Sequence, residues 1–85
     1  MQRTIVYFRS GLRKVAIRQV PPFNGNDDER EVQYIDVKEK KKVKRLDNVI
    51  YYGWTDDAYY RVQIEEKVGF VNAAAFEGGE GLGRI

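Results

Sequence analysis

The sequence contains neither cysteine nor histidine. Without cysteine the chain has no disulfide, no thiolate nucleophile and no cysteine-bound zinc, and without histidine it lacks the commonest metal ligand and general base. A catalytic site would have to work with carboxylates, Lys, Tyr, Ser or Thr alone. We therefore expect a protein that is not an enzyme and that uses no cofactor and no metal.

Long apolar runs are missing as well. No stretch approaches the roughly 18 apolar residues of a membrane span, and residues 1–8 lack the apolar segment and cleavage site of a signal peptide. The expectation is a soluble, cytoplasmic protein with no membrane partner. A chain of 85 residues has room for one domain. We expect that domain to span residues 1–76 and a flexible, Gly-rich tail to occupy residues 77–85.

What the sequence does contain is a series of short runs rich in β-branched and aromatic residues. Apolar residues recur in them with period two rather than 3.6, the pattern of β-strands. The runs occupy residues 3–8, 14–20, 31–37, 41–46, 49–54, 59–64 and 68–71. Asn72 is placed to cap a single helical turn that follows the last run. The predicted fold class is all-β: a small antiparallel barrel of five or six strands with a short helical turn near the C-terminus.

Strand alternation predicts which side chains form the core. The clearest case is residues 59–64, where Tyr60, Val62 and Ile64 take one face, while Tyr59 takes the other. The following residues are expected in the core: Val15, Ile17, Tyr60, Val62, Ile64, Val71 and Phe76.

The C-terminal third carries a more specific pattern. The run Tyr59-Tyr60-Arg61-Val62 precedes a hairpin, and the run Lys67-Val68-Gly69-Phe70-Val71-Asn72 then leads to an apolar Phe76. This pattern resembles the ending of bacterial-type SH3 domains, and a looser likeness extends it to about residues 13–76. The resemblance implies an SH3-like barrel in which Gly69 lets two strands approach closely and Phe76 plugs one end. It also implies that outward aromatic residues line a ligand groove.

The predicted binding surface consists of these outward aromatic residues. Alternation places Tyr59 and Phe70 opposite the core on adjacent strands, so they are expected to be exposed and to form one patch. Trp54 and Phe23 can extend it, although Trp54 fits a core position equally well. The predicted function is a protein- or peptide-binding module, acting as an adaptor, an inhibitor or a subunit. The small size is compatible with a phage or mobile-element protein.

A basic run at residues 38–45 supports an alternative. With Val43 inward, the run can be a solvated edge strand whose lysines prevent edge pairing. It can also bind nucleic acid together with Arg13, Lys14 and Arg18, although 13 acidic side chains and a net charge of +2 weigh against strong binding. The alternative basic surface comprises Lys40, Lys41, Lys42, Lys44 and Arg45.

Acidic residues in predicted turns complete the candidates. Asp56-Asp57 and Glu65-Glu66 can stabilise turns, where exposed carboxylates stay ionised and serve no catalytic purpose. Residues 24–29 resemble a calcium loop only superficially, because they lack alternating oxygen ligands and a distal Glu. The identity of the ligand and the oligomeric state are left open.

Overall fold

Antiparallel β-strands make up nearly all of the regular structure. The computed structural model describes residues 4–20, 32–37, 42–53 and 57–79. The strands are β1 (Thr4–Tyr7), β2 (Lys14–Arg18), β3 (Val32–Asp36), β4 (Lys42–Arg45), β5 (Tyr51–Tyr52), β6 (Ala58–Ile64) and β7 (Lys67–Asn72). A 3₁₀ helix, η2 (Ala73–Ala75), follows β7 directly. Within the described residues, the prediction of an all-β fold with a short helical turn near the C-terminus is confirmed. Six of the seven described strands are close in extent to the predicted runs, but residues 49–54 contribute only the two residues of β5.

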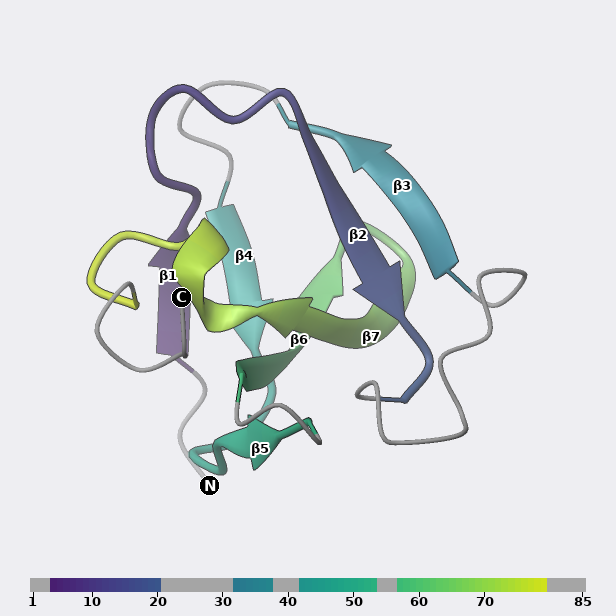
Figure 1. The fold of residues 1–85 in the computed structure, drawn as a ribbon, viewed down its shortest axis with the longest axis vertical. Helices are drawn as coiled ribbons and strands as arrows, with labels where there is room; N and C mark the ends of the chain where they lie inside the picture. Colours follow the sequence, from purple (N-terminus) through teal and green to yellow (C-terminus); the bar gives the residue numbers. More distant parts are fainter. Residues whose placement is uncertain (1–3, 21–31, 38–41, 54–56, 80–85) are drawn as a thin grey trace.

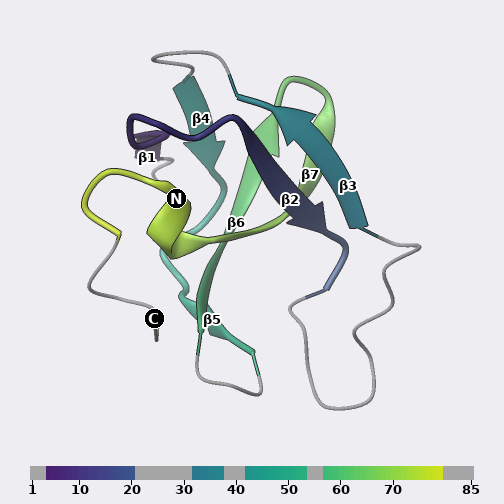
Figure 2. The same cartoon turned by 45° about the horizontal axis from the view of Figure 1, so that its top comes forward.

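The strands form one sheet in the order β1-β4-β6-β7-β2-β3, and β5 pairs with β6 outside this path. In Figures 1 and 2, β2 and β3 lie side by side on one side of the molecule, β1 and β4 on the other, and β6 and β7 between them. Six strands therefore make up the main path, and β5 is a seventh. Among the described strands no ladder joins β1 to β3, so the sheet is not closed.

A single bridge connects the end of β1 with the segment that follows η2. Phe8 pairs with Phe76 in antiparallel orientation. Beside this pair, the Arg9 N–H donates to the Ala75 carbonyl oxygen at 3.0 Å, and the Glu77 N–H donates to the Tyr7 carbonyl oxygen at 2.9 Å. These hydrogen bonds hold η2 next to the end of β1, as Figure 1 shows.

The core lies on the inner face of the sheet. Every residue predicted for the core is buried, and Phe8, Val43, Ala58 and Ala73 join them. Phe76 is the largest fully buried side chain, and its ring stacks on Phe8 at 5.0 Å and on Tyr60 at 5.7 Å between centroids. Such ring pairs contribute about 0.5–1.5 kcal/mol beyond the burial of their apolar area. Alternation therefore identified the inner face correctly.

Gly69 marks the closest approach of two strands. β7 meets β2 at the pair Arg18↔Phe70, directly beside Gly69. A Cβ atom on Gly69 would lie 2.6 Å from the Arg18 carbonyl oxygen and 2.6 Å from Ile17 Cγ1. Only a residue without a side chain fits there, in agreement with the expected role of Gly69.

The helical turn has the predicted cap. The Asn72 side chain accepts a hydrogen bond from the Ala74 N–H through Oδ1 at 2.9 Å. This bond satisfies a donor that the first turn leaves free. None of the helical segments in the described ranges has the length and apolar character needed to cross a membrane.

The basic strand β4 is an inner strand, so its interpretation as an edge strand is wrong. β1 pairs with one side of β4, with Val6 opposite Val43 and Ile5 opposite Lys44, and β6 pairs with the other side. The expectation that Val43 points inward is confirmed, since it is 1% exposed. The edge interpretation failed because β1 pairs with β4. Local sequence does not reveal this pairing, since the two strands are far apart along the chain.

Candidate functional site

Tyr59 is buried, which contradicts its predicted exposure. Its side chain is 5% exposed, yet it lies outside the core cluster that contains Tyr60. Its face of β6 is flanked on both sides, because Tyr59 pairs with Tyr51 of β5 and with Asn72 of β7. Alternation determines which face a side chain takes, whereas neighbouring segments determine whether that face is covered.

Phe70 is half-buried and takes part in an aromatic cluster on the outer face. Its ring meets Tyr51 edge-to-face, with centroids 5.0 Å apart and planes at 75°. Across the sheet it is in register with Arg18 on one side and Arg61 on the other. Tyr51 links the two predicted residues, since it pairs with Tyr59 and contacts Phe70. We call Tyr51, Tyr59 and Phe70 the outer aromatic cluster.

Tyr51 was not identified from the sequence. Several aromatic residues crowd its segment, and only the register between β5 and β6 shows which of them faces Phe70. The other two predicted members of the patch, Trp54 and Phe23, lie outside the described residues.

A hydrogen bond holds the Tyr51 side chain in place. Its hydroxyl donates to Asp47 Oδ2 at 2.8 Å, and Asp47 Oδ1 accepts from the Val49 N–H at 3.1 Å. The hydrogen bond to Asp47 raises the pKa of the Tyr51 phenol. Burial and the Asp47 charge raise this pKa further, and Arg61 opposes the shift. The proton on Tyr51 is therefore held more tightly than usual, and the hydrogen bond to Asp47 fixes the hydroxyl end of the ring that contacts Phe70.

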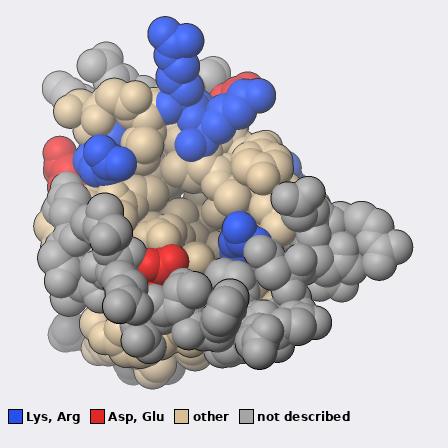
Figure 3. Space-filling view, in the orientation of Figure 1, with Lys and Arg blue, Asp and Glu red and all other residues tan. Residues whose placement is uncertain are grey.

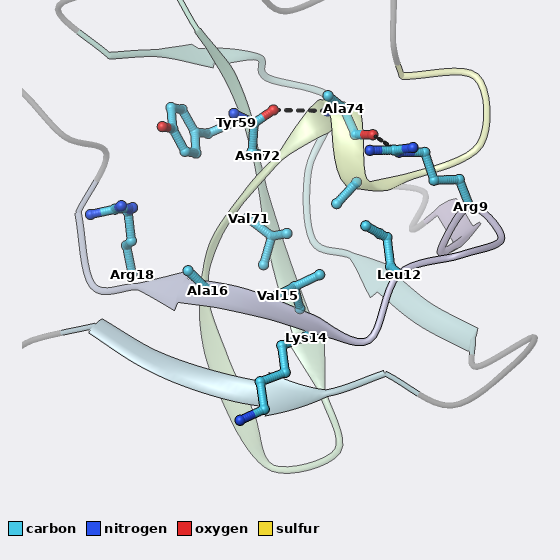
Figure 4. A pocket seen from close by; sticks show the side chains of 11 residues that line it. Arg9, Leu12, Lys14, Val15, Ala16, Arg18, Tyr59, Val71, Asn72 and Ala74 are labelled. Carbon is cyan, nitrogen blue, oxygen red and sulfur yellow. Dashed lines mark hydrogen bonds between the residues drawn. The ribbon is translucent and has the colours of Figure 1, made fainter.

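A groove lies beside this cluster, between β2, the end of β7 and η2. Its volume is about 290 Å³, just below the range of roughly 300–1,000 Å³ that is usual for ligand sites. Figure 3 shows it as a hollow lined mainly by uncharged atoms, and Figure 4 shows the side chains around it. The lining residues are Arg9, Leu12, Lys14, Val15, Ala16, Arg18, Tyr59, Val71, Asn72, Ala74 and Ala75.

The charged residues that line the groove are all basic: Arg9, Lys14 and Arg18. Among the described lining residues none is acidic, although Figure 3 shows an acidic group at the lower margin of the hollow. Arg9 is held in place because its Nε donates to the Ala74 carbonyl oxygen at 2.7 Å. The groove thus combines aliphatic walls with a positively charged rim.

The predicted basic surface is only partly present as a surface. Arg45 is half-buried, and its guanidinium carbon lies 4.0 Å from the centroid of the Tyr60 ring. Its Nη2 donates to the Val49 carbonyl oxygen at 3.4 Å, and its buried Nε has no hydrogen-bond partner within the described parts of the chain. Arg45 shares the strand parity of Val43, so its guanidinium packs on the Tyr60 ring and only part of the side chain is available as a surface.

Lys44 is exposed, as the basic-surface prediction requires. It lines a shallow hollow of about 230 Å³ together with Ile5, Gln63 and Glu65. A carboxylate among these lining residues weakens the attraction of this hollow for an anion. Lys42 belongs to β4, but its side chain is not described, and Lys40 and Lys41 lie outside the described residues.

Comparisons with protein-family models, with curated proteins and with solved structures find no match for this chain. Within the described residues, no group of three or more His, Cys, Asp or Glu side chains could hold a metal ion.

Proposed function

We propose that this chain is a non-enzymatic binding module that holds a short segment of a protein or peptide in the groove between β2, β7 and η2. The observation that carries the proposal is the composition of the groove. Its walls are aliphatic, while its polar lining side chains other than Tyr59 present N–H donors. An extended peptide offers the matching groups, because it has a carbonyl acceptor at every residue and apolar side chains at intervals.

The available hydrogen-bonding groups support this assignment. Asn72 uses its carbonyl oxygen to cap η2, so its amide nitrogen is the group that remains to act as a donor. Arg9 uses Nε on Ala74 and keeps the N–H groups of its two terminal nitrogens. Both residues are fixed by η2, so a ligand would lose little of its binding energy to ordering them.

The proposed fold is an SH3-like barrel of the bacterial type. Its support is the way in which the chain returns from β7 to β1, since the bridge Phe8↔Phe76 lies directly after η2. The close approach at Gly69 bends β7 against β2 as such a barrel requires. The groove would then lie on the outside of the barrel wall.

We propose binding without catalysis because the chain lacks histidine and cysteine and because none of the described carboxylates lines the groove. Glu65 and Glu66 form the exposed turn between β6 and β7, and neither lines the groove. We propose no cofactor and no metal for the same reasons.

Nucleic-acid binding by residues 38–45 is the alternative. Two observations favour the peptide groove over it: Arg45 packs on Tyr60, and Lys44 shares its hollow with Glu65. A nucleic-acid complex that neutralises many phosphates would lose affinity steeply with added salt, whereas a complex in the groove has at most three basic side chains to lose and would weaken less. A salt titration therefore separates the two.

Selection from a displayed library of random dodecapeptides tests the proposal. Ala16 and Ala74 line the groove from two different elements, so Ala16→Trp and Ala74→Trp should each fill it. Lys44→Trp adds a similar bulk at an exposed site outside it. We expect the wild type and Lys44→Trp to enrich the same peptides, and Ala16→Trp and Ala74→Trp to lose them. Circular dichroism checks that each variant is folded. Peptides that both Ala16→Trp and Ala74→Trp retain, or that only Lys44→Trp loses, would contradict the proposal.

A further inference from the structure

We infer that the peptide segment taken by the groove is acidic, with two carboxylate side chains flanking an aliphatic one. This inference rests on the proposed function and adds the chemical class of the ligand. It follows from the arrangement of Arg9, Lys14 and Arg18 around the aliphatic lining.

The basic residues lie at both ends of the groove. Lys14, Ala16 and Arg18 alternate along β2, so they share one face of the strand. At about 3.3 Å per residue, the Cα atoms of Lys14 and Arg18 are separated by roughly 13 Å. Figure 4 shows Arg18 at one end of the lining residues and Arg9 with Leu12 at the other. An anionic ligand can therefore meet positive charge at each end.

This spacing predicts a pattern in the ligand. An extended peptide along β2 places every second side chain on the face that meets the groove. An aliphatic residue over Ala16 then has carboxylates two residues before and two residues after it, close to Lys14 and Arg18. The expected pattern is acidic, any residue, aliphatic, any residue, acidic. Arg9 lies with Leu12 at one end of the lining and can contact a carboxylate or a backbone carbonyl of the ligand there.

The aliphatic lining favours a peptide over a nucleic acid. Single-stranded nucleic acids bind by stacking bases on exposed aromatic faces as well as by phosphate contacts. Tyr59 is the one aromatic residue among the described lining residues, and it is 5% exposed, so it offers no free ring face. Small side chains such as Ala16 and Ala74 leave room for aliphatic ligand groups instead.

The composition of the peptides recovered from the library tests the inference. We expect Asp and Glu to be enriched about twofold or more over the unselected library, at positions four residues apart. The strongest peptide is then titrated, with a fluorescent label, against the wild type and against the double variant Arg9→Glu/Lys14→Glu. We expect the variant to bind on the order of tenfold more weakly, because repulsion replaces attraction at one end of the groove.

Two controls keep this result interpretable. Lys67→Glu reverses an exposed charge that does not line the groove and should leave the affinity within about twofold of wild type. The neutral double variant Arg9→Gln/Lys14→Gln should bind with intermediate affinity, and it serves as the measured variant if the charge reversal does not fold.

The outcomes distinguish the two levels of the proposal. Peptides that depend on the groove but show no acidic enrichment overturn the inference and leave the proposed function intact. If the wild type enriches no peptide that Ala16→Trp and Ala74→Trp fail to enrich, the proposed function itself is overturned. A twelve-residue oligo(dT) that binds more tightly than the best peptide, and is lost in Arg9→Glu/Lys14→Glu, replaces the acidic peptide with a nucleic acid.

Discussion

Replacing Gly69 with alanine should destabilise the fold, because two strands meet at this residue. The added Cβ would lie 2.6 Å from the Arg18 carbonyl oxygen and 2.6 Å from Ile17 Cγ1, with Ile17 Cδ1 at 3.2 Å. Ordinary carbon contacts are about 3.5–4.0 Å. The neighbours must therefore retreat by roughly 1 Å. The Arg18 oxygen belongs to the backbone, and the β-branched Ile17 is 1% exposed, so neither can rotate away.

The size of the effect follows from two opposing terms. Overpacking a well-packed site costs about 1–3 kcal/mol. Replacing glycine also reduces the conformational freedom of the unfolded chain, which stabilises the folded state by about 0.4–1 kcal/mol. A net loss of about 1–2 kcal/mol is expected, which lowers the melting temperature of a domain of this size by roughly 5–15 °C.

Thermal unfolding of Gly69→Ala, followed by circular dichroism, measures this loss. The matched control is Val68→Thr, which changes the preceding residue of β7 at an exposed site and should stay within about 0.5 kcal/mol of wild type. A melting temperature of Gly69→Ala within about 1 °C of wild type, or above it, would refute the close approach of β2 and β7.

Three further predictions address the core, the Arg45 side chain and Tyr51. Val62→Ala should cost about 1–3 kcal/mol in urea unfolding, because Val62 is fully buried and leaves a cavity; a change below about 0.3 kcal/mol would mean that the inner face is wrongly assigned. Arg45→Ala should cost about 1–2 kcal/mol, since it removes the contact with the Tyr60 ring, whereas Lys44→Ala should change stability by less than about 0.5 kcal/mol; equal effects would show that Arg45 is solvated. Because the pKa of Tyr51 is raised in the folded state, stability should fall as pH rises from about 10 through that raised pKa, where the unfolded chain has already released the proton. Tyr51→Phe should make that fall smaller, and an unchanged pH profile would contradict the hydrogen bond to Asp47.

The inner face of the sheet could be predicted because alternation is a local property. Val15 and Ile17 alternate with Lys14, Ala16 and Arg18, and Val62 and Ile64 alternate with polar residues, so a one-residue error would have moved all four to the wrong face. The Asn72 cap is also local, since it depends on residues two positions apart. Such features require no knowledge of strand pairing.

The outer face could not be predicted in the same way, because its cover comes from distant segments. Tyr59 is covered because β5 and β7 flank it. The groove needs Arg9 from the segment after β1, Arg18 from β2 and Ala74 from η2, which are far apart in the sequence. Arg45 shares the strand parity of Val43, but the prediction assumed that a basic side chain faces solvent. The stem and guanidinium of an arginine can instead cover an aromatic ring, as Arg45 covers Tyr60.

An NMR titration of the ¹⁵N-labelled chain with the strongest selected peptide tests the central claim most directly. We expect the amide signals of Lys14–Arg18 in β2 and Ala73–Ala75 in η2 to shift in proportion to the bound fraction, and the same peptide to leave the signals of Ala16→Trp unchanged. Shifts confined to Thr4–Tyr7 and Lys42–Arg45, on β1 and β4, would contradict the groove and move the binding site to the basic strand.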